Sequence, residues 1–257
     1  MEDVPISIPK DFLGIISKGV QSILFYIIPL YNQNDMWAKV KNFILDLLYP
    51  QFCFNCGREG NYLCEDCQSI LGVLNTHQKH QTHPPAGRLK DLYFALPYQE
   101  TLIKNLIQKF KYQPFVKGLA ISLTSLIITH FQLLDNKPNF SGFTLIPVPL
   151  EKKKLKWRGF NQAEEIGKEL AKFLKIPLIK DALVKIKETL PQIELPEEER
   201  KENIKDAFSI KNGNQILGKK ILLVDDIYTT GSTLEECAKV LKKAGAKEII
   251  GIVIARG

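Results

Sequence analysis

Two adjacent carboxylates, Asp225 and Asp226, stand directly before a loop rich in hydroxyl side chains, in the stretch ILLVDDIYTTGSTLEE. Residues 221–224 are all aliphatic, which is typical of a strand buried on both faces in the centre of a parallel sheet. In such folds ligands bind at the carboxyl ends of the strands, which is where the two aspartates fall. The loop beyond them contains Thr229, Thr230, Gly231, Ser232 and Thr233.

The loop 229–233 has the composition of a phosphate-binding site. Backbone N–H groups at the start of a helix, the helix dipole and several hydroxyls all favour an anion there, and Gly231 lets the backbone approach a ligand closely. Asp225 and Asp226 would repel a phosphate, but they accept hydrogen bonds from neutral hydroxyls. Together the two halves indicate a ribose 5-phosphate. The nucleotide motifs G-x-x-x-x-G-K-[ST] and G-x-G-x-x-G do not occur in the sequence.

Four of the five cysteines lie close together in the stretch CFNCGREGNYLCEDC. They form two C-x-x-C pairs, Cys53 with Cys56 and Cys64 with Cys67. Each pair places two thiolates on one tight knuckle, and two knuckles together form a tetrahedral zinc site with no position left open for catalysis. A redox dithiol is the alternative. Clustered cysteines also indicate a reducing compartment, so we expect a cytoplasmic protein.

Strand and helix patterns alternate from Leu92 onward, which predicts an α/β fold with a mostly parallel sheet flanked by helices. The expected strands lie at 92–98, 143–150, 219–226 and 248–255. The expected helices lie at 102–110, 162–174 and 233–244. Asn161 with Glu164, and Thr233 with Glu236, have the spacing of capping boxes that open the last two helices. The charged segment 185–203 contains two prolines, and we expect a long loop there with a helical turn at 196–203.

Composition divides the chain into four regions: an N-terminal helical extension at 1–35, a helix plus the cysteine cluster at 36–75, a linker at 76–91 and the α/β domain at 92–257. Residues 12–30 are apolar at helical spacing. We expect this helix to pack on its own protein, and a membrane-surface helix is the alternative. The linker carries histidines at a regular spacing, which we expect to be exposed to solvent: His77, His80 and His83.

Basic residues outnumber acidic ones by 35 to 28, which gives a formal net charge of +7 and a pI near 9.0. This excess favours anionic partners such as phosphorylated small molecules, nucleic acid or an anionic membrane surface. The charge by itself does not choose among the three, because many solvated surfaces are basic.

The stretch 221–236 resembles the phosphoribosyl-pyrophosphate (PRPP) motif of type I phosphoribosyltransferases, and its surroundings are similar to the ComF family of competence-associated proteins. The supporting sequences are IPVPL, WRGFNQAE, ETLPQ, EEERKENIKDAF and LKKAGAKEI. Upstream, LDLLYPQFCFNCGREG and LCEDC resemble the small zinc ribbon that precedes the transferase-like domain in this family. The resemblance implies a type I phosphoribosyltransferase-like sheet behind a four-cysteine zinc ribbon and leaves residues 1–35 outside it.

The resemblance also implies residue roles. Asp225 and Asp226 would bind the ribose hydroxyls of PRPP, directly or through Mg²⁺, and the loop 229–233 would hold the 5-phosphate. The basic run after IPVPL would face the pyrophosphate, with Arg158 and Lys156 as its candidate residues. The flexible loop that closes over PRPP in this superfamily corresponds to 185–203, which adds three weaker candidates: Thr189, Gln192 and Arg200.

The implied function is that of a phosphoribosyltransferase-like protein that binds PRPP and Mg²⁺ and is linked to DNA uptake in natural competence. Two alternatives stay open. One is a single-stranded DNA-binding accessory protein, beside a competence helicase, for which PRPP is only a ligand or regulator. The other is an active phosphoribosyltransferase of unknown acceptor in nucleotide metabolism. We do not expect a complete glutamine amidotransferase, because that activity needs an N-terminal cysteine nucleophile and residue 2 is Glu2.

Overall fold

The computed structural model describes residues 50–73, 88–189 and 197–257. Residues 52–257 form one compact unit. The expected helices of the first 49 residues, the proposed membrane-surface segment 12–30 and the three linker histidines lie outside the described residues. Within the described ranges, no helix is long and apolar enough to cross a membrane.

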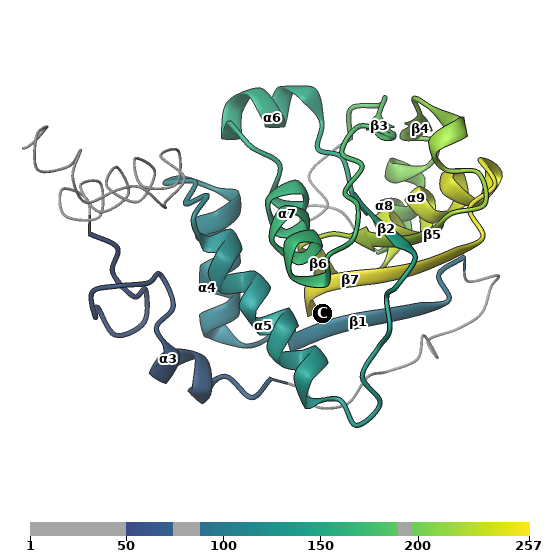
Figure 1. Ribbon diagram of the computed structural model, residues 1–257. Helices are drawn as coiled ribbons and strands as arrows, with labels where there is room; N and C mark the ends of the chain where they lie inside the picture. Colours follow the sequence, from purple (N-terminus) through teal and green to yellow (C-terminus); the bar gives the residue numbers. More distant parts are fainter. Residues whose placement is uncertain (1–49, 74–87, 190–196) are drawn as a thin grey trace, which may run out of the picture. The chain divides into compact units, whose positions relative to one another are not determined.

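A parallel sheet forms the centre of this unit, in the strand order β1-β7-β5-β2 (Figure 1). The strands are β1 (Asp91–Pro97), β2 (Phe143–Pro147), β5 (Lys220–Val224) and β7 (Glu248–Arg256), with the short β6 (Ile227–Tyr228) pairing the end of β7. All their pairings are parallel. The α/β fold with a mostly parallel sheet is therefore confirmed, and each expected strand lies within two or three residues of its predicted bounds.

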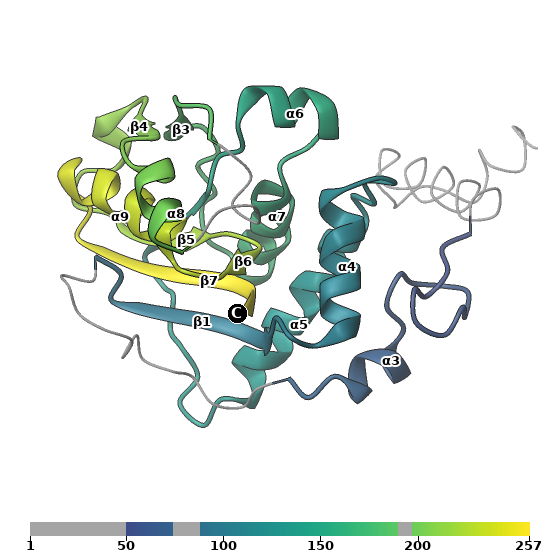
Figure 2. The ribbon, with the colours of Figure 1, turned by 180° about the vertical axis from the view of Figure 1, so that it is seen from behind.

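Helices cover both faces of the sheet, and alternate residues of each strand point to opposite faces. On one face α4 (Thr101–Lys111), α5 (Leu119–Leu133) and α7 (Gln162–Leu174) share a core with Leu222 and Val224 of β5. On the other face α9 (Ser232–Lys243) packs with Ile221 and Leu223. Figures 1 and 2 show these two layers from opposite sides. With both faces covered, β5 carries its aspartates to the edge where the sheet ends.

A second, smaller sheet lies beside α9. Its two antiparallel strands are β3 (Leu183–Lys185) and β4 (Phe208–Ile210), and α8 (Glu197–Ile204) lies between them in the sequence. The segment 185–203 was predicted as a loop with one helical turn. The structure keeps that turn as α8 and begins the segment with the end of β3, while residues 190–196 lie outside the described residues.

The two predicted capping boxes have different outcomes. Asn161 is the N-cap of α7, whose bounds match the prediction, and its side chain accepts a hydrogen bond from the Ala163 N–H at 3.2 Å. The prediction for the later helix is wrong. α9 begins at Ser232 with Gly231 as its N-cap, because Gly231 adopts a left-handed φ of 75°. Thr233 therefore lies inside the first turn.

Candidate functional site

The acidic pair lies at the carboxyl end of β5, where neighbouring strand β7 holds its backbone. Asp225 donates its N–H to Ile252 O at 3.0 Å, and Asp226 O accepts from the N–H of Ile254 at the same distance. Asp225 Oδ1 in turn accepts the N–H of Asp226 at 2.9 Å. The aspartates are thus fixed by the sheet itself, and Asp226 is buried.

The electrostatics of the pair favour one proton or one cation at this place. Burial raises the pKa of Asp225 to about 7, and the adjacent charge of Asp226 adds to the effect. Lys111 and Lys185 oppose the shift. Two carboxylates in this setting do not ionise together without a positive partner.

Lys111 supplies that partner, and the sequence analysis did not identify it. It is the last residue of α4, and its Nζ lies 2.8 Å from Asp226 Oδ1, with side chains only 22% and 9% exposed. Burial alone would lower the pKa of Lys111, but the carboxylates of Asp226 and Asp225 outweigh it and raise the pKa. The ammonium is therefore retained inside the site.

Arg158, a predicted pyrophosphate residue, lies close to the same carboxylate. It ends helix α6 (Lys152–Arg158), donates from Nη1 to Gln162 Oε1 at 3.0 Å and stacks over the ring of Tyr112 at 5.5 Å. Desolvation lowers its pKa, while the charge of Asp226 acts in the opposite direction. Its buried Nε has no hydrogen-bond partner among the described residues, so a buried donor stands ready for an anionic ligand.

Gln162 is a second residue that sequence reasoning missed. It is almost fully buried, and its Nε2 donates to Phe110 O at 2.8 Å while its Oε1 accepts from Arg158. It thereby joins the end of α4 to the end of α6. Lys156, the other predicted pyrophosphate residue, is exposed, and none of the contacts found in the described part of the chain joins it to the acidic pair.

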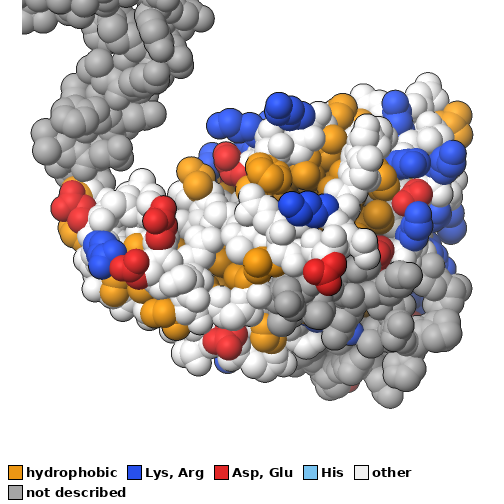
Figure 3. Space-filling model, turned by 60° about the horizontal axis from the view of Figure 1, so that its bottom comes forward, with side chains coloured by type: hydrophobic (Ala, Val, Ile, Leu, Met, Phe, Trp, Pro, Cys, Tyr) orange, Lys and Arg blue, Asp and Glu red, His pale blue; other side chains and the backbone are white. Residues whose placement is uncertain are grey.

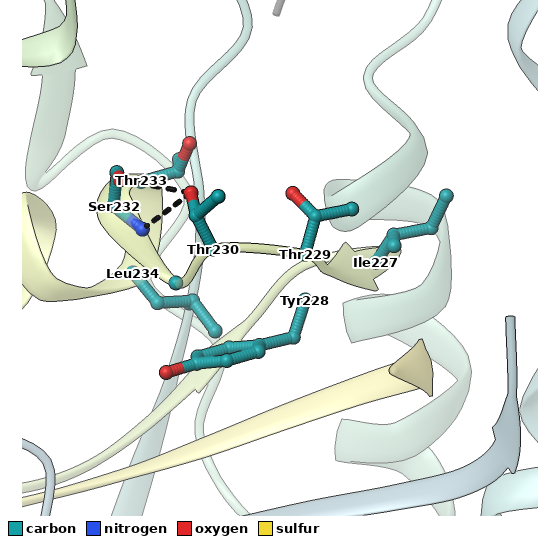
Figure 4. Close-up of a pocket in the computed structure, with 8 residues that line it drawn as sticks. Ile227, Tyr228, Thr229, Thr230, Ser232, Thr233 and Leu234 are labelled. Atoms are coloured by element: carbon teal, nitrogen blue, oxygen red, sulfur yellow. Dashed lines mark hydrogen bonds between the residues drawn. The ribbon is translucent and has the colours of Figure 1, made fainter. Parts of the chain in front are cut away.

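The hydroxyl loop lies at the start of α9, directly after β6 (Figure 4). Thr229 and Thr230 point to one side of the loop, and Tyr228 and Leu234 lie on the other side. Thr230 Oγ1 and Ser232 Oγ are hydrogen-bonded at 2.9 Å. Residues 227–234 line a hollow of about 210 Å³, including space open to solvent. The loop that is predicted to bind a phosphate thus forms a polar hollow at the N-terminus of α9.

Of the three weaker candidates, Thr189 is the one whose side chain is described. Its Oγ1 accepts from Lys185 Nζ at 2.7 Å, and Lys185 is the last residue of β3. Desolvation and the charge of Lys154 lower the pKa of Lys185, and of the charges that act in the opposite direction Glu151 is the largest and Asp225 a smaller one. Lys185 is therefore a further cation near the acidic pair that the sequence analysis missed. Arg200 lies in α8, and Gln192 lies outside the described residues.

The four clustered cysteines converge as predicted. The Sγ atoms of Cys53, Cys56, Cys64 and Cys67 all lie within 4.8 Å of one another, a set that could hold a metal ion. Asn55 Nδ2 donates to Cys67 Sγ at 3.2 Å, and the Cys64 N–H to Cys53 Sγ at 3.5 Å, as is usual for thiolate ligands. The donor set fits zinc.

The helix that ends the cysteine segment packs on the sheet domain. This helix, α3 (Glu65–Ile70), contributes Gln68, which accepts from Ser125 at 3.1 Å and donates to Thr129 at 3.3 Å on α5. The cysteine segment and the sheet domain thus share one core.

A family model and several named proteins match this chain in sequence. A family model described as "Phosphoribosyl transferase domain" matches residues 161–257. "Competence protein F" of Haemophilus influenzae is 31% identical over 202 residues, which cover 77% of this chain and 81% of that protein. "DNA utilization protein YhgH" of Salmonella typhi is 33% identical over 200 residues, with 77% and 85% covered. "Competence protein ComFC" of Streptococcus pneumoniae is 29% identical over 203 residues, with 77% of each chain covered.

The parallel sheet and the matching domain define a phosphoribosyltransferase-like protein. The identity with competence protein F over most of both chains shows the family, and the chain belongs to the ComF/ComFC family. The fold class and the family expected from the sequence are confirmed.

Proposed function

We propose that this protein binds PRPP with Mg²⁺ at the carboxyl end of β5 and that it serves DNA uptake in natural competence. The observation that carries the proposal is the arrangement at the end of β5, where the half-buried Asp225 and the buried Asp226 are followed at once by the hydroxyl loop 229–233 and its polar hollow. The names of the relatives, competence and DNA utilization proteins, support the cellular role.

In this proposal each part of the site meets one part of the ligand. Asp225 and Asp226 accept hydrogen bonds from the ribose hydroxyls, and the loop 229–233 donates to the 5-phosphate through N–H and hydroxyl groups. Arg158 offers its buried Nε to the pyrophosphate, and the charge of Lys185, at the end of β3, acts on Asp225. Mg²⁺ bound with the pyrophosphate supplies further neutralisation of its charge.

Transfer of the phosphoribosyl group to a bound acceptor would break the bond between C1 and the pyrophosphate, which leaves with the electron pair, and the acceptor would form its new bond to the oxocarbenium-like centre at C1. The carboxylates at the ribose hydroxyls stabilise that positive centre, and the cationic side chains stabilise the departing pyrophosphate. The segment that contains Thr189, Gln192 and Arg200 would exclude water from the cation.

Ligand-induced thermal stabilisation tests this proposal. PRPP with Mg²⁺ should raise the melting temperature of the parent protein, because a ligand that binds only the folded state stabilises it. The double variant Asp225→Asn, Asp226→Asn should lose the shift, whereas Asp135→Asn, an exposed aspartate elsewhere, should keep it. A parent protein that does not respond to PRPP would refute the proposal.

A second candidate function, binding of single-stranded DNA, is favoured by an aromatic pair of which one ring is exposed. Phe115 and Trp157 form an edge-to-face contact with centroids 4.8 Å apart, and Trp157 is 56% exposed. Trp157 lies on α6 among lysines, including Lys153 and Lys156. Basic and hydrophobic side chains also lie side by side on the face in Figure 3. Aromatic rings beside lysines suit stacked bases and phosphates of a single strand.

The proposal also includes zinc at the four cysteines, a helicase partner and a cytoplasmic location. The thiolate set supports zinc because four sulfur ligands are a usual set for a structural zinc site. The domain boundaries at 35, 75 and 91 stay a prediction.

A further inference from the structure

The ammonium of Lys111 forms an ion pair with Asp226 and so balances part of the negative charge of the proposed site. Lys111 is the last residue of α4, far from β5 in the sequence, and its Nζ lies 2.8 Å from Asp226 Oδ1. Both side chains are mostly buried. An ion pair of this kind is screened little by solvent, so the ammonium neutralises one carboxylate of the pair directly.

The end of α4 is held in place by buried contacts that do not involve the acidic pair. Phe110 is fully buried, its ring packs on Phe160 at 5.5 Å, and its carbonyl accepts the Gln162 amide at 2.8 Å. The preceding apolar residues of the helix lie in the same core. The position of Lys111 therefore follows from the packing of α4 and is available before any ligand binds.

The charges that face Lys111 come from two elements. Asp225 and Asp226 at the end of β5 attract its ammonium, and Arg158 at the end of α6 repels it. A sugar phosphate brought to this place adds more negative charge beside the two carboxylates. The cost of that repulsion has to be offset by a cation, and a divalent metal is the usual source.

We infer that Lys111 is a built-in counter-ion of the acidic pair, so that a sugar phosphate binds at Asp225 and Asp226 without a divalent cation at these carboxylates. Lys111 is thus a positioning residue. It holds one oxygen of Asp226, orients the carboxylate toward the ribose hydroxyls, and makes the metal a partner of the pyrophosphate arm alone. The inference rests on the proposed function, since it assigns a role within the same site.

Ribose 5-phosphate is the right probe, because it lacks the pyrophosphate that itself binds Mg²⁺. Calorimetric titration of the full chain should give a similar affinity in EDTA and in Mg²⁺. Lys111→Met, which keeps most of the length of the side chain and removes its charge, should weaken binding in EDTA by about tenfold or more, and Mg²⁺ should restore most of the loss. Lys104→Met, on the exposed side of the same helix, should behave like the parent.

Three results would overturn the inference. If the parent binds ribose 5-phosphate only with Mg²⁺, or if Lys111→Met binds equally well in EDTA, the inference fails and the proposed function stands. If the parent binds neither ribose 5-phosphate nor PRPP under any condition, both fail. Should the Met variant not fold, Lys111→Gln, which keeps a donor but no charge, has to show the same new dependence on Mg²⁺.

Discussion

The ring of Tyr228 occupies the space into which a side chain at position 231 would point. A Cβ at Gly231 would collide with the hydroxyl and ring atoms of Tyr228, and Gly231 also has a left-handed φ of 75°. Glycine is therefore required here for two separate reasons, the backbone conformation and the close approach of the ring. The turn that opens α9 and shapes the hydroxyl loop depends on both.

Gly231→Ala should accordingly destabilise the protein by about 2–5 kcal/mol, since a left-handed residue with a Cβ costs about 1–2 and overpacking about 1–3 kcal/mol. Gly218→Ala is the matched control. Gly218 has a similar φ of 70°, but nothing lies within 4 Å of its added Cβ, so only the backbone cost remains. Urea unfolding of both variants measures the difference. Equal losses of unfolding free energy in the two variants would show that Tyr228 moves away from the added Cβ at no cost.

The pH dependence of stability should report on Asp225. Its pKa is raised to about 7 in the folded protein from an ordinary value of 3.8, so the folded state holds a proton that the unfolded state has released. For this group alone, stability is greatest below pH 4 and is lost as the pH rises to about 7. The ionised carboxyl is thus a cost to the folded protein at pH 8.

Asp225→Asn should therefore stabilise the protein at pH 8 by on the order of 1–3 kcal/mol and less at pH 4.5, because the amide carries no charge and still offers an oxygen to the Asp226 N–H. Unfolding free energies of parent and variant across this range provide the measurement. Parallel curves for the two proteins would mean that Asp225 titrates normally. Asp135→Asn, an exposed position, should leave the parent curve unchanged.

Much of this site could be predicted from local sequence, and the remainder depends on contacts between distant segments. Residues 221–224 identified the central strand, and the spacing of Cys53, Cys56, Cys64 and Cys67 was enough to bring four thiols together. In the sequence pattern Lys111 lies on the polar side of its helix. Periodicity shows that such a residue avoids the apolar face, but it does not show which other segment a residue at the end of the helix contacts.

Gln162 illustrates the same limit. Its buried hydrogen bonds to Phe110 O and Arg158 Nη1 exist only after α4, α6 and α7 have packed together. The capping error at Thr233 has a different cause. Gly231 and Thr233 are both suited to the N-cap position of this helix. The left-handed conformation of Gly231 makes it the N-cap, so the helix begins at Ser232.

Metal analysis should find about one zinc per chain, bound by the four clustered cysteines. Cys64→Ser should reduce the zinc content to near zero and make the segment 52–71 more sensitive to protease, because a metal would no longer join the turn at Cys53 and Cys56 to the start of α3. Cys237→Ala is the control, since Cys237 is buried on α9 and belongs to the opposite core. Full zinc content in Cys64→Ser, or its loss in Cys237→Ala, would contradict the assignment.

Single-stranded DNA binding, the second candidate function, should depend on Trp157 and on salt in distinct ways. Trp157→Ala should weaken binding of a single-stranded oligonucleotide by about tenfold with an unchanged salt slope, because stacking contributes about 1–3 kcal/mol per base. Phe173→Ala removes another exposed ring, on α7, and should have no effect.

Lys156→Gln should lower the slope of log affinity against log salt by about one, as the loss of one phosphate contact requires. Fluorescence anisotropy over a salt series measures all three variants. Binding that is insensitive to salt, or equally reduced by Phe173→Ala, would exclude DNA from the surface around α6.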